Sequence, residues 1–157
     1  MAFNPNSTIL LCNVPFDSTY KHQVYFDKYV DTPETQINYF RNKMVKSFTE
    51  YLTVRKTLPN GQVQSSVKVG ANIDDLQLCN YMCYQNANHV TKWFYAFIEK
   101  LIYINENTTE IIFETDVWQT WLFDVDVTKS YVVREHSLTD EIGDNVVPES
   151  FNFTDYD

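Results

Sequence analysis

Residues 44–69, MVKSFTEYLTVRKTLPNGQVQSSVKV, contain two segments of alternating polarity joined by turn residues. In residues 62–69 three valines alternate with polar side chains, which is typical of a half-solvated strand. In residues 44–56, Phe48, Leu52 and Val54 fall on one face. Between the two segments, residues 58–61 (LPNG) favour a turn, because proline fixes φ and Asn-Gly accepts positive φ. The stretch therefore predicts an antiparallel hairpin of residues 44–56 with residues 62–69.

A second hairpin is expected further along the chain. Residues 93–104 are apolar on both faces, which favours a central strand covered on each side, although periodicity alone leaves a buried helix open. The polar residues 105–109 then lead into residues 110–117, where apolar and acidic side chains alternate. Additional strands are predicted at residues 8–12, 81–85, 123–127 and 131–134.

Two helical segments are predicted. Residues 32–44 begin with Thr32 as a candidate N-cap and Pro33 at the first helical position, and Ile37, Phe40 and Met44 recur at helical spacing. A shorter turn is expected around residues 72–76, with an asparagine cap at Asn72. The predicted fold class is α+β, mainly β: an antiparallel sheet, or a sandwich-like or barrel-like domain, with one or two short helices. Residues 1–150 are expected to form a single domain, and residues 151–157 a tail or the truncation point of a longer chain.

Composition supports a folded domain. The chain has 157 residues, of which 44% are hydrophobic and 16% aromatic, so it can bury a sizeable core. It contains no apolar run of the ~18 residues that a membrane-spanning helix needs, and its N-terminus lacks the pattern of a secretory signal. The protein is therefore expected to be made in a reducing cytoplasm. Cys12, Cys79 and Cys83 have poor spacing for zinc, so buried thiols are favoured over a metal site.

The charge is concentrated in the last third of the chain. Residues 1–104 hold 10 Lys/Arg and 8 Asp/Glu, whereas residues 105–157 hold 2 Lys/Arg and 13 Asp/Glu. A surface that grips DNA needs clustered cations to replace released counterions. The sequence therefore argues against a conventional nucleic-acid binder, while repulsion of DNA stays open as a function.

The acidic residues allow a catalytic interpretation and a structural one. Glu114, Asp116, Asp124 and Asp126 could supply paired carboxylates for glycoside cleavage. However, acidic residues at every second position occur on any strand face that is exposed to solvent. We therefore favour the interpretation that these acids cover a strand face and have no catalytic role.

Other signs of catalysis are weak. Arg134, Glu135 and His136 are adjacent, and neighbouring strand residues point to opposite faces, so Glu135 would not orient His136. The sequence has no G-x-S-x-G motif and its glycines are isolated, so neither an enzyme nor a cofactor is predicted. Trp118 and Trp121, with Phe123 and Val125, are expected to pack in a β core, with a protein interface or a sugar platform as the alternatives.

Several motifs occur in an order that resembles one known family. They are residues 13–16 (NVPF), Tyr20, residues 84–87 (YQNA), 92–97 (KWFYAF), 113–117 (FETDV), 119–121 (QTW) and 133–136 (VREH). Together they resemble the N-terminal part of the tail knob, or distal tail tube, proteins of small short-tailed phages, podoviruses of the Picovirinae type. The run from Phe113 to Trp121, followed by residues 134–136, is the most specific part.

The resemblance implies a virion structural protein that is made in the bacterial host cytoplasm and located in the tail. Its partners would be other copies of itself, in a six-fold ring, and neighbouring tail proteins. DNA would pass through the ring without specific binding, and this segment would make no membrane contact. The alternative is a carbohydrate-binding or receptor-binding β domain of a tail.

Residue roles in such a ring follow as a hypothesis. Acidic walls would repel DNA and let it slide. The candidate lumen or interface residues are Glu114, Asp116, Asp124, Asp126, Trp118, Trp121, Arg134 and Glu135.

Overall fold

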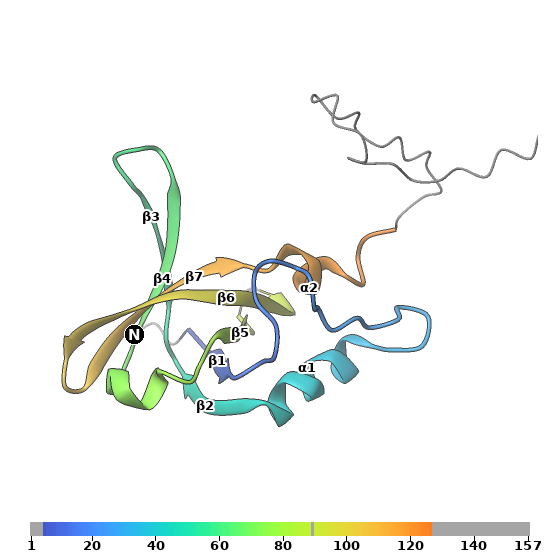
Figure 1. Ribbon diagram of the computed structural model, residues 1–157, viewed down its shortest axis with the longest axis horizontal. Helices are drawn as coiled ribbons and strands as arrows, with labels where there is room; N and C mark the ends of the chain where they lie inside the picture. Colours follow the sequence, from blue (N-terminus) through green and yellow to red (C-terminus); the bar gives the residue numbers. More distant parts are fainter. Residues whose placement is uncertain (1–4, 89, 127–157) are drawn as a thin grey trace, which may run out of the picture. The chain divides into compact units, whose positions relative to one another are not determined.

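The computed structural model describes residues 5–88 and 90–126, which form a seven-stranded antiparallel sheet with two short helices (Figure 1). This confirms the predicted mainly β class. The strands are β1 (Ser7–Cys12), β2 (Met44–Thr49), β3 (Thr53–Thr57), β4 (Val63–Val69), β5 (Tyr81–Asn86), β6 (Val90–Asn105) and β7 (Thr108–Thr115). The helical elements are α1 (Pro33–Asn42), the 3₁₀ helix η1 (Ile73–Leu76) and α2 (Val117–Trp121).

A short connection between the two edges of the sheet determines its shape. The strand order is β2-β1-β5-β6-β7-β4-β3, so β2 and β3 are consecutive in sequence but stand at opposite ends. In a flat sheet, six strand spacings would separate them by about 29 Å. The four Cα steps from Thr49 to Thr53 span at most about 14 Å. The sheet must therefore curl into an open barrel.

Contacts of Tyr51 hold the two edges together. Its backbone carbonyl accepts a hydrogen bond from Ser7 Oγ at 2.5 Å, and its hydroxyl accepts one from the backbone N–H of Gly70 at 3.0 Å. Ser7 opens β1 near one edge, and Gly70 follows β4 near the other. A single residue thus bridges strands that a flat sheet would keep far apart.

The inner face of the curled sheet carries one core. The register aligns Ile9 with Phe48 and Tyr84, and Val67 with Ile111, so apolar residues of paired strands share this face. The buried members of the inner core are Ile9, Leu11, Phe48, Val67, Val69, Ala71, Leu76, Cys79, Met82, Ala96, Ile111 and Phe113. A cavity of about 510 Å³ opens at its end, lined by residues of β1, β3, β4, β5, β6 and β7. Strands from both halves of the sheet therefore meet inside the barrel.

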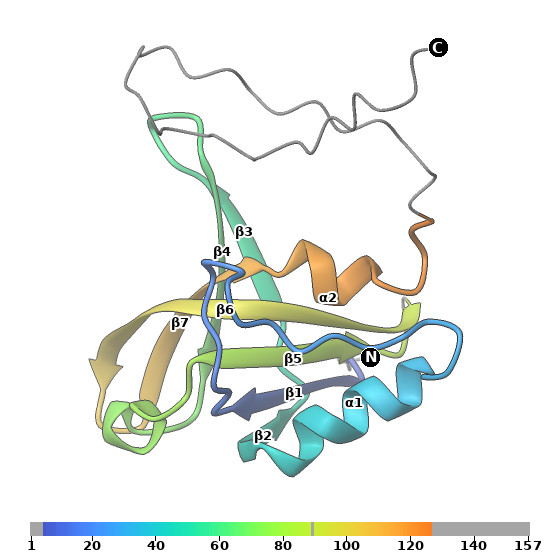
Figure 2. The same ribbon diagram turned by 45° about the vertical axis from the view of Figure 1, so that its right-hand side comes forward.

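The outer face of β1, β5 and β6 carries a second core beneath α1, which lies alongside β1 (Figure 2). Phe40 of α1 stacks on Tyr81 of β5 with ring centroids 5.1 Å apart, and it contacts Tyr95 of β6 at 4.9 Å. Phe16, from the loop before α1, packs edge-on against Tyr81 at 5.3 Å. β6 is a central strand, and its residues 95–97 are buried on both faces, so the prediction of a covered central strand at residues 93–104 is correct for this part. Tyr103 and Ile104 at its far end are exposed.

The predicted helical caps are confirmed. Thr32 caps α1 by accepting a hydrogen bond from the backbone N–H of Thr35, Pro33 begins the helix, and Ile37 and Phe40 are buried. Asn72 caps η1 by accepting a hydrogen bond from the N–H of Asp74. The expectation that Met44 packs as part of the first helix is wrong. The helix ends at Asn42, and Met44 begins β2 with its side chain exposed.

The predicted hairpin at residues 44–69 is only partly correct. β3 and β4 form an antiparallel hairpin, and Gly61 adopts a φ of 82° in its turn. Residues 44–49, however, form a separate strand that pairs with β1 at the other edge of the sheet. Glu50, with a φ of 67°, breaks the extended backbone between them.

Three strand predictions in the last third of the chain need correction or lie outside the structure. β6 and β7 form the expected second hairpin, but β7 ends at Thr115, and residues 117–121 are helical. Residues 122–126 are a turn and irregular backbone, so no strand begins at Phe123. The strand predicted at residues 131–134 lies outside the described residues.

Cys12, Cys79 and Cys83 are buried free thiols, as predicted.

The bridge between Tyr51 and Gly70 predicts non-additive mutations. A Cβ at Gly70 would lie 2.7 Å from the Tyr51 hydroxyl oxygen, so Gly70→Ala should lower the free energy of unfolding by about 1–3 kcal/mol. Tyr51→Phe removes that oxygen and one hydrogen bond, at a cost of about 0.5–1.5 kcal/mol. The double variant should lose less than the sum of the two single losses, as measured by urea unfolding.

A matched control uses the other described glycine with a special role. Gly61→Ala strains a backbone at positive φ, yet no atom lies within 4 Å of its added Cβ. The loss in free energy of unfolding caused by Gly61→Ala should add to the loss caused by Tyr51→Phe. If the losses caused by Gly70→Ala and Tyr51→Phe were also additive, the bridge between Tyr51 and Gly70 would be contradicted.

Candidate functional site

The candidate residues within the described chain lie in and around α2, in a stretch here called the α2 segment (residues 114–126). Asp116 starts the helix: its Oδ1 accepts a hydrogen bond from the backbone N–H of Gln119 at 3.1 Å. Its Oδ2 accepts one from the Tyr81 hydroxyl at 2.8 Å, and Tyr20 donates to Oδ1 at 3.4 Å. Asp116 has no exposed surface. The carboxylate is therefore a structural anchor for α2.

Burial sets the protonation of this anchor. Loss of solvation raises the pKa of Asp116 above the usual aspartate value, although the hydrogen bonds from Tyr81, Gln119 and Tyr20 oppose the rise. The pKa of Tyr81 is also raised, first by burial and then by the negative charge of Asp116. Tyr81 thus stays a hydrogen-bond donor at neutral pH.

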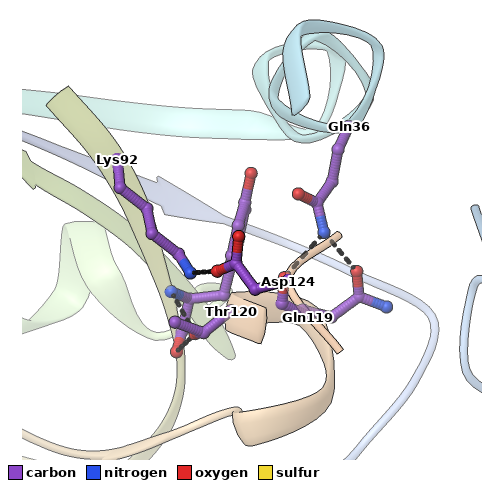
Figure 3. Close-up of polar contacts among 6 residues, drawn as sticks. Gln36, Lys92, Gln119, Thr120 and Asp124 are labelled. Atoms are coloured by element: carbon purple, nitrogen blue, oxygen red, sulfur yellow. Dashed lines mark hydrogen bonds and ion pairs between the residues drawn. The ribbon is translucent and has the colours of Figure 1, made fainter. Parts of the chain in front are cut away.

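Two further residues of α2 tie the helix to its surroundings (Figure 3). Gln36 of α1 donates from Nε2 to both the backbone carbonyl and the side-chain oxygen of Gln119, each at 2.8 Å. Gln119 in turn donates to the carbonyl of Val24 at 2.7 Å. Thr120 Oγ1 accepts a hydrogen bond from the N–H of Tyr95 at 3.1 Å. Since α1, β6 and the loop before α1 all hold α2, its outer face has a fixed orientation.

An ion pair closes the end of the segment. Lys92 of β6 contacts the carboxylate of Asp124, as Figure 3 shows, and its Nζ lies 5.3 Å from the Trp121 ring centroid. Trp121 also meets Phe94 edge-on at 6.5 Å. Both members of the pair are partly exposed, so the pair adds little stability in water.

The outer face of α2 is aromatic and exposed. Trp118 is 54% exposed and Trp121 38%. A groove of about 220 Å³ runs beside Trp118, and its lining residues are Tyr20, Gln23, Val24, Tyr25, Trp118, Gln119 and Leu122. Large exposed apolar patches are a feature of interaction surfaces in soluble proteins. The expectation that Trp118, Trp121 and Val125 fill a core is wrong, whereas Phe123 is half-buried against the outer core.

The acidic candidates do not share one environment. Glu114, at the end of β7, is exposed, and Asp124 pairs with Lys92. Asp126 is exposed at the end of the described chain. The prediction that Asp116 lies on a solvated strand face is wrong, because Asp116 is buried at a helix start. Arg134 and Glu135 lie outside the described residues.

Asp116 and Asp124, two of the acids considered for glycoside cleavage, are engaged by different partners, Tyr81 and Lys92. Among residues 5–88 and 90–126, no group of three or more His, Cys, Asp or Glu side chains is placed to hold a metal ion. In the same part of the chain, no helix has the length and apolar character needed to cross a membrane.

Sequence reasoning missed the partners of Asp116, although a signal for the helix was present. Asp116 and Gln119 have the spacing of a capping box, in which a polar N-cap precedes Glu or Gln by three residues. The roles of Tyr20, Tyr81 and Gln36 had no local signal, because they come from distant parts of the chain.

Comparison with known proteins identifies relatives over most of the chain. The family described as Caudoviral major tail protein N-terminus matches residues 6–128. Tail knob protein gp9 of Bacillus phage B103 is 33% identical over 156 residues, covering 94% of this chain and 24% of the relative. The tail knob protein gp9 of Bacillus phage PZA is 34% identical over 155 residues, with the same two coverages.

A third relative, tail knob protein gp9 of Bacillus phage phi29, is 35% identical over 130 residues, covering 81% of this chain and 20% of the relative. The chain thus spans about a quarter or less of the length of these relatives.

The buried carboxylate predicts a specific pH dependence. Because the pKa of Asp116 is raised on folding, the folded state binds more protons than the unfolded state between the usual aspartate pKa and the raised one. The contribution of Asp116 to the free energy of unfolding should therefore fall as pH rises through that window. Asp116→Asn keeps a capping oxygen but cannot titrate, so its stability relative to the unmodified protein should increase with pH over the same interval.

Urea unfolding of both proteins at a series of pH values measures the difference. Glu114→Gln, at an exposed position two residues away, is the matched control and should show no such trend. A stability difference for Asp116→Asn that is constant or falls with rising pH would contradict the raised pKa.

Proposed function

Because the chain belongs to the Caudoviral major tail protein N-terminus family, we propose that it is a structural component of a phage tail, located in the virion. Copies of the chain assemble into a ring, with six members as the resemblance to tail knob proteins implies. Neighbouring tail proteins continue the structure, and DNA leaves the virion through the channel. The protein carries out no chemical step of its own, in keeping with the tail knob names of its relatives. These names do not favour the alternative of a carbohydrate-binding domain.

One observation carries the channel proposal. Residues 110–126 contain five acidic residues and neither lysine nor arginine. Duplex DNA carries about one negative charge per 1.7 Å of its axis, so a wall of carboxylates repels it and gives it no fixed binding site. A passage that must release DNA quickly benefits from this repulsion.

Burial and hydrogen bonding limit which of these acidic residues can repel DNA. Asp116 is buried, and Glu110 is held by Ser66 and Lys56. Glu114 is exposed, and the Asp124 side chain stays 58% exposed although it pairs with Lys92. We assign these two carboxylates to the channel wall.

The ring requires two different surfaces on each copy. A closed ring of identical subunits uses head-to-tail contacts, in which one patch meets another patch of the next copy. Trp118 and Trp121 supply one such patch, since exposed aromatic residues are enriched at interfaces. The hydrogen bonds of Gln119 and Thr120 fix the helix that presents them.

Reversal of the wall charge tests the channel. Virions carrying Glu114→Lys and Asp124→Lys together should eject DNA severalfold more slowly than unmodified virions, because the cations would hold the phosphates. The delay should shrink as salt increases, since salt screens these contacts. Single-virion ejection assays measure both effects.

Glu106→Lys, at the exposed turn between β6 and β7, is the control and should leave ejection unchanged. Normal ejection by the double variant in fully assembled tails would remove these residues from the channel wall.

A further inference from the structure

The β3–β4 hairpin, with its turn and the residue pair before it, forms an exposed projection that we call the arm (residues 51–69). Figures 1 and 2 both show the hairpin extending away from the other strands. Every residue of β3 is exposed, and Leu52, Val54 and Val63 are 51%, 47% and 66% exposed. β3 is also an edge strand, so one row of its backbone groups has no partner strand. An exposed apolar edge of this kind is a template for contact with another chain.

The arm is cationic. Residues 51–73 contain Arg55, Lys56 and Lys68 and no acidic residue. Lys56 pairs with Glu110 of β7 at 3.4 Å, and no described carboxylate forms an ion pair with Arg55. Arg55 therefore brings a positive charge to the face of the hairpin that also carries the exposed Val63.

The groove beside α2, here called the aromatic groove, has aromatic and acidic residues that complement the cationic arm. Its rim includes Tyr25 and Trp118, which are 75% and 54% exposed. Residues 17–31, which supply four of its lining residues, contain three aspartates and two lysines. A guanidinium is attracted both to the carboxylates and to the faces of the aromatic rings.

The aromatic groove also holds an unused hydrogen-bond donor. The side-chain oxygen of Gln23 accepts from Gln119, but its Nε2 is buried and has no acceptor within the described residues. A buried donor without an acceptor costs stability unless a partner supplies one. The unpaired edge of β3 offers backbone carbonyls, which are acceptors of the required kind.

From these observations we infer that the arm of one copy docks into the aromatic groove of the next copy. Val63 supplies apolar contact, Arg55 on the same face of the hairpin lies over the tyrosine and tryptophan rings, and a backbone carbonyl of β3 accepts from Gln23. Because the arm and the groove are different surfaces, the contact is head-to-tail and suits a closed ring. The inference rests on the proposed ring and specifies which surfaces form it.

Introduced cysteines test the contact directly. The three native cysteines are buried, so an added surface cysteine is the reactive thiol. The assembled protein carrying both Val63→Cys and Tyr25→Cys should form covalent multimers larger than dimers on mild oxidation. Neither single variant should do so, because a head-to-tail contact never brings two copies of one position together. The control pairs Val63→Cys with Val45→Cys on exposed β2, and it should give no multimers.

A second measurement does not depend on oxidation. Trp118→Ala changes a side chain that is half exposed, so the variant should fold, yet it should require at least a tenfold higher concentration for half-assembly. Analytical ultracentrifugation provides this concentration.

The outcomes separate the two proposals. If the unmodified protein assembles but the Val63–Tyr25 pair cross-links no better than the control, the docking inference is overturned and the ring stands. Covalent dimers from a single variant would also overturn it, since they indicate a symmetric contact. If the unmodified protein stays monomeric at every concentration tested and in the presence of its tail partners, the ring itself is wrong.

Discussion

The three residues between β2 and β3 impose the constraint on which the rest of the structure depends. They join the two outermost strands of a seven-stranded sheet, and a chain of that length cannot cross a flat sheet. The sheet must therefore curl, and its inner face becomes a closed apolar core. Tyr51 fixes the curl by bonding to Ser7 on one side and to Gly70 on the other. Positive φ at Glu50 allows the chain to leave β2 in the required direction.

Curling leaves the outer face of β1, β5 and β6 to be covered separately. Helix α1 and the loop before it do so, with Phe40 against Tyr81 at the centre. Asp116 then anchors α2 to the same tyrosine, and Gln36 links α1 to α2. The exposed tryptophans of α2 and the exposed arm are thus attached to the same set of strands and helices. Two fixed and dissimilar surfaces are what a ring of identical subunits needs.

Local signals in the sequence predicted much of this fold. Thr32 and Pro33 marked the start of α1, residues 58–61 marked the turn of the β3–β4 hairpin, and the apolar run at residues 93–104 marked the central strand. The separation of β2 from β3 was missed because polar and apolar residues alternate on both sides of Glu50, as in one continuous strand. Which edge of the sheet each strand joins depends on its pairing with strands distant in sequence. Residues 117–121 contain valine and tryptophan, which favour strands, so the capping signal at Asp116 was overlooked. Exposure of Trp118 was not predictable, because burial of an aromatic side chain depends on its neighbours in space.

The contact between Tyr51 and Gly70 gives the most direct test of the curled sheet. Proton NMR of the isolated chain should show nuclear Overhauser cross-peaks from the Tyr51 ring to both the Gly70 amide proton and the Phe48 ring, since these groups adjoin in the barrel. Cross-peaks between β1 and β2, and between β3 and β4, provide the internal reference for intact pairing. If those reference peaks are present while the Tyr51 ring shows none to Gly70, the two halves of the sheet do not meet and the account is contradicted.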